Sequence, residues 1–504
     1  MSEAFDRRVV LRNVAANLAS GAAAAVLAVF LPPFLVRLLD RDTYSVWALL
    51  LQLGAYTGLL SFGLQTAIGR FVAHAEARKD PAQSDAIVST AVAALAAAAL
   101  VAVVITVGLA AAMPRLFPDI PPFLQSEART GLLWVGGSLA AGLPFVAVSG
   151  VFTGLQRTEI AAAIIVGSRL VTAAALVAAA ASGYGLVSMA KVFAVVNLLT
   201  YAAQWAALRW FVPALNLSRR NVSGKSLREL VDYSTSLAVW SFAMLLVSGL
   251  DLVLVGRFDF AAVGAFAIAT GLVNLLQGGQ GVVMNAFLPV AAALDARGDR
   301  AGLKRLLLRT TRWNLLSLGV ALGVYGLIGR AVLDAYVGAA YVADVASILS
   351  ILLLAATIRL SMLPYNIVAI GTGDHRRIIL SPLAEGICNL LASAFLGWRF
   401  GAIGVAWGTV AGGLVGVGFH LWLNLPRSPR LGVGLGTFAS EAFVPAVIAV
   451  IPVMLVAAID GSGVGGGAGG MTATVAALAF VVLAWGFALE SGERRSIVSG
   501  MKLR

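Results

Sequence analysis

Five ionisable side chains fall within long apolar stretches of the sequence, where a charge is costly to place. Arg169, Asp251, Arg359 and Glu385 lie well inside their stretches, and Lys191 lies near the end of another. On insertion scales, a charged residue at the centre of a membrane helix costs about 2.5 to 3.5 kcal/mol, so it usually faces a partner or a wet cavity. These residues are therefore the first candidates for chemistry in this chain.

The cationic members of this set fit a phosphate-binding role. A guanidinium group presents a rigid fork of donors that pairs with two phosphate oxygens. Arg169, Arg359 and Lys191 are therefore predicted to line a cationic cavity. In the alternative interpretation, Arg169 pairs with Glu385 only to neutralise both charges, and Lys191 reaches outward to the aqueous interface. The sequence leaves both interpretations open.

The two acidic members are candidates for ion coupling. Asp251 and Glu385 are assigned this role by elimination, because they are the carboxylates farthest from the ends of the apolar stretches. The sequence holds one cysteine, Cys388, and three histidines, without the Cys/His spacing that is typical of metal sites. Neither a metal nor a cofactor is therefore expected.

Uncharged polar residues form a stripe along the apolar stretch 261–289. Asn274, Gln277, Gly281 and Asn285 follow steps of three, four and four residues, so they share one helical face. Two other stretches carry similar side chains, which are Ser241 and Ser248 in one and Asn13, Asn17 and Ser20 in the other. These groups suit a wet lumen that handles hydroxyl-rich molecules. The alternative is hydrogen bonding between helices, worth about 0.6 kcal/mol per contact.

The elements that must position these residues are membrane-spanning helices. The chain has 504 residues, of which 60% are hydrophobic and 12% charged, and its mean hydropathy is +0.92. A soluble protein carries about 25% charged residues. Apolar runs between residues 13 and 489 are repeatedly long enough to cross roughly 30 Å of hydrocarbon. The predicted fold class is all-α, a polytopic membrane protein of about 14 transmembrane helices.

The positive charges predict the orientation of these helices. Of the 36 Lys and Arg residues, 26 fall in loops on the side of the N-terminus and 7 on the opposite side. Such loops stay in the cytoplasm, so both termini are expected there. The net charge of +12 thus reflects topology, and no nucleic-acid partner is expected. The basic segments 213–230 and 295–312 are predicted as short amphipathic helices on the anionic leaflet or as solvated loops.

The two halves of the sequence show weak internal similarity. The matches pair Asp40 with Asp259, Asp80 with Asp299 and Gly185 with Gly401, at offsets of 219, 219 and 216 residues. The alternative is chance similarity among Ala/Gly-rich helices. A true repeat predicts two six-helix lobes in a pseudo-twofold arrangement, with a site between them. The expected parts are a lobe at 1–212, a cytoplasmic linker at 213–230, a lobe at 231–425, and two additional helices with a tail at 426–504.

Several segments resemble those of a known transporter family. They include FLPPFLVRLLDRDTYSVWALL (30–50), SFGLQTAIGRFVA (61–73), DLVLVGRFDFAAVGAFAIA (251–269), LPYNIVAIGTGDHRR (363–377) and GAIGVAWGTV (401–410). In this order the segments resemble polysaccharide transporters, the O-antigen flippase branch of the multidrug/oligosaccharidyl-lipid/polysaccharide exporter superfamily. The resemblance extends over roughly residues 8–425.

This resemblance implies a fourteen-helix flippase that works by alternating access and is not an enzyme. Its substrate would be an undecaprenyl-diphosphate-linked oligosaccharide, moved from the cytoplasmic to the periplasmic leaflet of a bacterial inner membrane for surface polysaccharide export. The implied partners are this lipid-linked substrate, membrane lipids, and a polymerase with other export components. One alternative is a multidrug-type cation-coupled antiporter of the same superfamily, with Asp251 as its ion site. Another is a membrane glycosyltransferase or polymerase, although the predicted outside loops are short and their acidic residues scattered.

Overall fold

The computed structural model describes residues 21, 29–374, 380–428, 431, 433–461, 469–489 and 493–494. All regular elements in these ranges are helices. The first expected span, with Asn13, Asn17 and Ser20, lies largely outside the described residues. Its described part is the apolar helix Val29–Leu38.

Among the described residues, 12 helices are long and apolar enough to cross a membrane. One of them, Leu380–Asn424, contains Gly401 in a non-helical conformation with φ 60° and ψ −142°. The chain reverses at this glycine, so this helix crosses twice. Together with the short helix Val29–Leu38, the crossings agree with the prediction of about fourteen. The predicted all-helical, multi-pass membrane fold is confirmed.

The chain divides into two compact units, residues 1–242 and 243–504, and each is described by itself. The division falls near the end of α9 (Gly224–Met244). The domain limits expected from the sequence stay a prediction.

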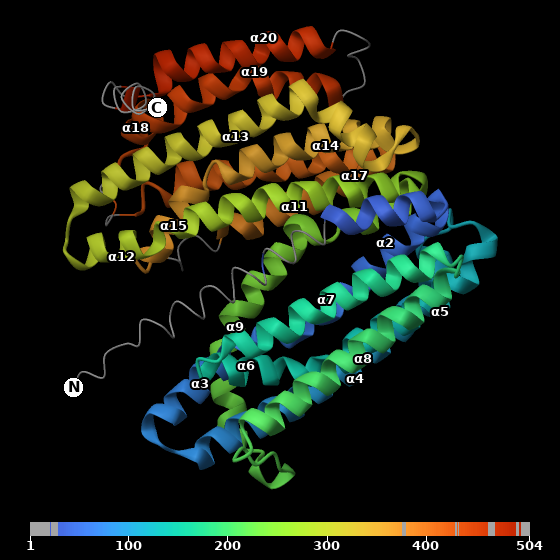
Figure 1. Ribbon diagram of the computed structural model, residues 1–504. Helices are drawn as coiled ribbons and strands as arrows, with labels where there is room; N and C mark the ends of the chain where they lie inside the picture. Colours follow the sequence, from blue (N-terminus) through green and yellow to red (C-terminus); the bar gives the residue numbers. More distant parts are fainter. Residues whose placement is uncertain are drawn as a thin grey trace, which may run out of the picture. The chain divides into compact units, whose positions relative to one another are not determined.

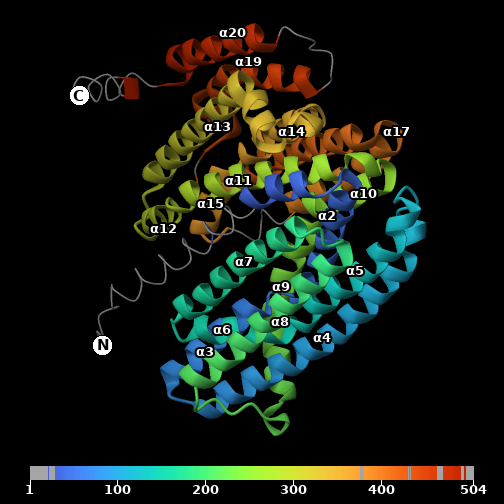
Figure 2. The same cartoon turned by 45° about the vertical axis from the view of Figure 1, so that its right-hand side comes forward.

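Unit 1 is a bundle in which α5 packs against α2, α4 and α8, and α3 packs against α6 (Figures 1 and 2). Short 3₁₀ turns at Tyr56–Ser61 and Leu143–Phe145 interrupt two of its crossings. Its helices are α2 (Arg41–Ala55), α3 (Leu64–Arg78), α4 (Pro81–Leu116), α5 (Pro122–Ala141), α6 (Val146–Gly154), α7 (Thr158–Ala181) and α8 (Leu186–Phe211), followed by α9.

Unit 2 is built around α14, which packs against α11, α13, α17 and α19. Figure 1 shows α13, α19 and α20 side by side in this unit. Its helices are α10 (Asp251–Phe258), α11 (Val263–Asn285), α12 (Leu288–Ala296), α13 (Arg300–Val337), α14 (Ala339–Leu360), α15 (Leu363–Gly371), α17 (Leu380–Phe419), α18 (Leu435–Phe438), α19 (Val444–Gly461) and α20 (Gly469–Leu483).

The basic segment 295–312 does not form a separate surface helix or a loop. Its larger part is the first third of α13, which runs without a break from Arg300 to Val337. The prediction for this segment was wrong because no proline interrupts the sequence between Arg300 and Val337, so the helix continues from the charged segment into the apolar one.

The same local structure recurs at one pair of matching segments in the two units. Lys79 and Gly298 both adopt the left-handed conformation, with φ 53° and 67°. The next residues, Asp80 and Asp299, each accept a hydrogen bond from the backbone N–H three residues later, at 2.9 and 2.7 Å. Each aspartate therefore caps a long helix, of 36 residues in α4 and 38 in α13. This recurrence supports an internal repeat.

Candidate functional site

A cluster of buried oxygen atoms surrounds Asp251 in unit 2. The Asp251 residue is 6% exposed, and its Oδ2 accepts a hydrogen bond of 3.2 Å from the hydroxyl of Thr409. Nearby, the Ser393 hydroxyl donates to Asn389 Oδ1 at 2.7 Å and lies 3.1 Å from the Val405 carbonyl oxygen. The Thr409 hydroxyl also lies 3.2 Å from the Val405 carbonyl. The cluster thus gathers carboxylate, amide, hydroxyl and carbonyl oxygens in one place.

The two halves of α17 approach closely enough to form this cluster because glycines line their contact. Gly404, Gly408, Gly412 and Gly416 follow steps of four residues, and we call them the glycine ladder. A Cβ atom at Gly412 would lie 2.7 Å from the Cβ of Asn389. At Gly416 it would lie 2.6 Å from Oε2 of Glu385. The opposite half of the hairpin can therefore place polar side chains directly against this backbone.

Helix α10, which begins with Asp251, is held against the same hairpin. The turn Leu245–Gly249, a π-helical segment, precedes Asp251, and the side-chain amide of Asn389 donates to the Val247 carbonyl within it. At the other end of α10, Asp259 Oδ2 accepts a hydrogen bond of 3.1 Å from the backbone N–H of Ala402. Because both ends of α10 are tied to α17, the position of Asp251 is fixed by its neighbours.

Arg359 and Glu385 form an ion pair inside unit 2. The distance from Arg359 Nε to Glu385 Oε1 is 3.3 Å, and their side chains are 17% and 11% exposed. Arg359 is also close enough to Asp251 to interact with its charge. The arginine is therefore matched by acidic side chains of its own unit. The sequence considered Arg169 as the partner of Glu385, whereas the structure gives Glu385 a partner on the neighbouring helix α14.

The two cationic candidates of unit 1 lie on exposed positions of α7 and α8. Arg169 follows Ile165 by one helical turn, on the same face of α7. Lys191 Nζ lies 6.0 Å from the centre of the Trp134 ring, at the limit of a cation–π contact.

The predicted polar stripe lies on the less buried side of α11. Asn274 and Asn285 are exposed, and Gln277 is half-buried. Ser241, on α9, is half-buried, and the side chain of Ser248 lies outside the described residues. The role of these residues as the wall of a lumen stays a prediction.

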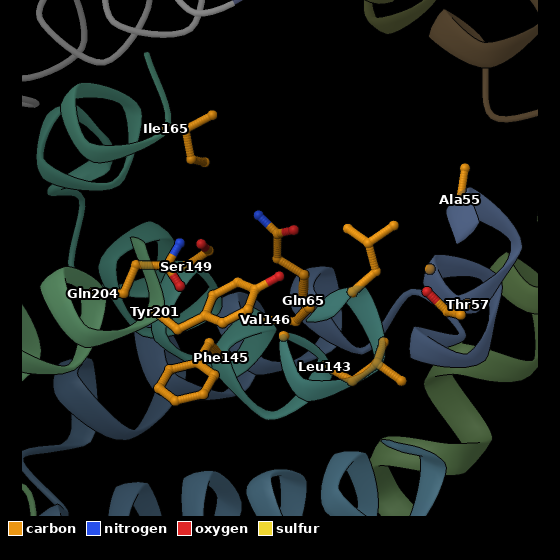
Figure 3. A pocket seen from close by; sticks show the side chains of 13 residues that line it. Ala55, Thr57, Gln65, Leu143, Phe145, Val146, Ser149, Ile165, Tyr201 and Gln204 are labelled. Atoms are coloured by element: carbon orange, nitrogen blue, oxygen red, sulfur yellow. The ribbon is translucent and has the colours of Figure 1, made fainter. Parts of the chain in front are cut away.

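A pocket of about 310 Å³ in unit 1 brings together polar side chains that the sequence analysis did not connect (Figure 3). Its polar lining is Thr57, Gln65, Ser149, Tyr201 and Gln204, and its apolar lining includes Leu143, Phe145, Val146 and Ile165. The Tyr201 ring stacks on Phe145, with 5.2 Å between ring centres and 14° between ring planes. Six helices (α2, α3, α5, α6, α7 and α8) and two 3₁₀ turns line this space, which combines amide, hydroxyl and aromatic groups.

The sequence analysis missed the pocket of unit 1 and most of the residues around Asp251, and the spacing of polar residues could have identified both groups. Tyr201 and Gln204 are three residues apart on α8 and therefore face the same way. In α17, Glu385, Asn389 and Ser393 are four residues apart within an otherwise apolar stretch. Both patterns consist mainly of uncharged residues, which attract less attention than an isolated arginine.

The fold is shared with solved structures of membrane transporters. It is similar to the lipid II flippase MurJ in an inward closed conformation, with a TM-score of 0.66 and 12% identity, over 94% of this chain and 99% of that one. It is also similar to an inward-facing multidrug resistance MATE family transporter of the MOP superfamily, with a TM-score of 0.61 and 16% identity, over 81% and 96% of the two chains. The two similar structures are thus a lipid II flippase and a multidrug resistance transporter.

The chain belongs to the polysaccharide biosynthesis protein family, whose family model matches residues 10–294. A curated relative, the uncharacterized membrane protein EpsK of Bacillus subtilis (strain 168), is 21% identical over 338 residues. That match covers 65% of this chain, and the chain spans 65% of the length of the relative. The recognition made from the sequence is confirmed: this is a multi-pass membrane protein of a polysaccharide transporter family.

Proposed function

We propose that this protein is a flippase that moves an undecaprenyl-diphosphate-linked oligosaccharide from the cytoplasmic to the periplasmic leaflet of the inner membrane by alternating access. The observation that carries the proposal is the pocket in Figure 3. Its amide and hydroxyl groups can hydrogen-bond to sugar hydroxyls, and the Tyr201 ring offers an apolar face to a sugar ring. The family membership and the likeness to a lipid II flippase support the same assignment.

In this proposal Arg169 binds the diphosphate. It is exposed and lies one turn from Ile165, which lines the pocket, so a sugar in the pocket would bring its attached phosphates toward this part of α7. Arg359 is a weaker candidate for this role because Glu385 balances its charge at 3.3 Å. Lys191, whose Nζ lies 6.0 Å from the centre of the Trp134 ring, is proposed as a further cationic contact for the substrate.

The Asp251 cluster is proposed as the site of a coupling cation. Hard cations prefer oxygen ligands, and irregular helix segments at the middle of transporters often coordinate sodium ions or protons. The carboxylate of Asp251, the hydroxyls of Ser393 and Thr409 and the carbonyl of Val405 supply such oxygens beside the π-helical turn Leu245–Gly249. Glu385 remains a second protonation candidate.

The same cluster favours one second candidate function. A buried carboxylate among oxygen ligands also suits a cation-coupled antiporter of small molecules, and the likeness to a MATE transporter supports that option. The two functions differ in substrate rather than in fold.

The test is a gene deletion analysed for lipid-linked sugar intermediates in each leaflet. A flippase predicts accumulation in the cytoplasmic leaflet and loss of the surface polymer. An antiporter predicts normal polymer with altered drug tolerance, and a polymerase predicts single repeat units outside. Either of the last two results would contradict the proposal.

Variants of the pocket sharpen this test. Tyr201→Ala and Arg169→Gln are expected to abolish export while leaving membrane insertion intact. Arg115→Gln removes the same charge from an exposed position on α4 and serves as the control. Normal polymer from both pocket variants would contradict the assignment of the pocket.

A further inference from the structure

A cavity of about 1110 Å³ lies beside the first part of α13 in unit 2, away from the Asp251 cluster. Its charged lining consists of four basic residues and two acidic ones, which are Lys304, Arg305, Arg309, Arg312, Glu441 and Glu493. The described lining therefore has an excess of positive charge, which favours an anionic occupant.

The basic side chains are arranged on one face of α13. Arg305, Arg309 and Arg312 follow steps of four and three residues, so they form one stripe. Arg312 is buried, with 8% of its side chain exposed, and its Nη1 donates to the Glu441 carbonyl at 3.1 Å. A residue that served only to orient the helix in the membrane would not need to be buried.

One buried carboxylate organises this stripe. Glu493 Oε1 lies 3.3 Å from Arg309 Nε and 3.9 Å from Arg312 Nη2, and it accepts a hydrogen bond of 3.1 Å from the Trp313 indole N–H. Its side chain is 8% exposed. Glu493 thus ties together a buried guanidinium, that of Arg312, and an exposed one, that of Arg309, whose side chain is 67% exposed. The cavity therefore presents guanidinium donors that reach from its buried wall to its open side.

Most of the remaining lining is apolar, and Thr310 and Ser317 add two hydroxyl groups to it. The apolar lining includes Met284 from α11, Phe287 from the segment between α11 and α12, Leu294 from α12 and Leu306 from α13. The 38 residues of α13 span about 57 Å, whereas the hydrocarbon layer is about 30 Å thick, so part of the helix must extend beyond it. Tryptophan is enriched at the membrane interface, and Trp313 lies directly after the basic stripe. The cavity is therefore expected at the depth of lipid headgroups on the cytoplasmic side.

We infer that this cavity is a binding site for the phosphate group of an amphiphile, with the apolar tail along the wall formed by α11 and α12. Guanidinium groups pair with phosphate oxygens in a fixed bidentate geometry, and the apolar wall excludes water from the adjoining part of the ligand. A membrane phospholipid and a lipid-linked phosphate share this chemistry. The inference does not depend on the proposed flippase activity, because binding is measured without transport.

The experiment titrates lipids against the purified full-length protein in detergent and counts bound molecules by native mass spectrometry. The probes are phosphatidylglycerol, undecaprenyl phosphate, zwitterionic phosphatidylcholine, and inorganic pyrophosphate as a ligand without a tail. The test variant is the double substitution Arg305→Gln/Arg309→Gln, in which Glu493 keeps Arg312 and Trp313 as partners. The matched control is Arg297→Gln/Arg300→Gln, which removes the same charge from exposed neighbouring positions outside the cavity lining.

The test variant is expected to bind the two anionic lipids about tenfold more weakly, whereas the control changes affinity by less than about twofold. Equal losses in both variants would show diffuse attraction to basic loops and overturn the inference, as would unchanged binding in the test variant. Pyrophosphate binding as tight as that of the lipids would overturn the role of the apolar wall. Preference for undecaprenyl phosphate identifies a lipid-linked ligand as the source, and equal binding of both anionic lipids identifies membrane phospholipid; either result supports a phosphate site.

Discussion

The ion pair between Arg359 and Glu385 offers a direct test of how the charges inside unit 2 are balanced. The atoms Nε and Oε1 are 3.3 Å apart, and both side chains are largely buried. Removing one partner leaves the other as an uncompensated charge, which costs about 3 to 5 kcal/mol for buried pairs. Arg359→Met and Glu385→Gln are each expected to lower stability by an amount of this order.

The two single variants should not be equivalent. Arg359 interacts with Asp251 as well as with Glu385, so its loss leaves two carboxylates without compensation. Arg359→Met is therefore expected to be the more damaging change. The double variant Arg359→Met/Glu385→Gln should be more stable than Arg359→Met alone, by about 2 kcal/mol or more, because it removes the isolated carboxylate as well.

The assay is thermal and denaturant unfolding of the purified protein in one detergent, for the wild type, both single variants and the double variant. Purely additive losses in this double-mutant cycle would refute the reasoning, because they would mean that the pair contributes no coupling energy. Export of surface polymer, measured in the same four strains, should recover in the double variant along with stability. A stable double variant that fails to export would show instead that Arg359 or Glu385 takes part in transport beyond balancing charge.

Three further predictions concern other parts of the chain. Asp251→Asn should keep the fold but remove the dependence of transport on an ion gradient. The measurement is transport in proteoliposomes with sodium and proton gradients imposed separately. Unchanged ion dependence would exclude this residue from coupling. Gly412→Ala should lower the yield of folded protein, because the added methyl group overpacks against Asn389 at a cost of about 1 to 3 kcal/mol. The control Gly418→Ala should be tolerated, because no atom lies within 4 Å of the added methyl group. Equal yields of the two variants would contradict the role of the glycine ladder. Asp40→Ala should lower stability by about 1 kcal/mol through loss of the α2 N-cap, and an unchanged melting temperature would show that the cap is dispensable.

Most of the fold could be predicted from the sequence because membrane helices are encoded locally. Each apolar run carries its own signal, and the loop charges add the expected orientation. The segments 213–230 and 295–312 were the exceptions, because an amphipathic surface helix and the charged start of a longer helix have the same local pattern. Residues 224–230 begin α9 (Gly224–Met244), just as 300–312 begin α13. Only the continuous geometry of these helices distinguishes the two cases.

The candidate site could be predicted only in part. Asp251 and Glu385 stood out because a carboxylate inside an apolar stretch is rare. The partner of Glu385 could not be read from the sequence, because Arg359 reaches it only through the packing of α14 on α17. The pocket with Gln65 and Tyr201 was missed for a different reason: amides and phenols occur in many membrane helices, and only the fold shows which of them face one space.

The glycine ladder of α17 has a consequence for genetic screens. At Gly404, Gly408, Gly412 and Gly416 even one added methyl group would collide with the facing half of the hairpin. Random mutagenesis that selects for loss of export will therefore recover changes at a period of four residues in this region. Such positions can be mistaken for contacts with the transported molecule, and only a measurement of how much folded protein each mutant contains separates the two kinds of defect.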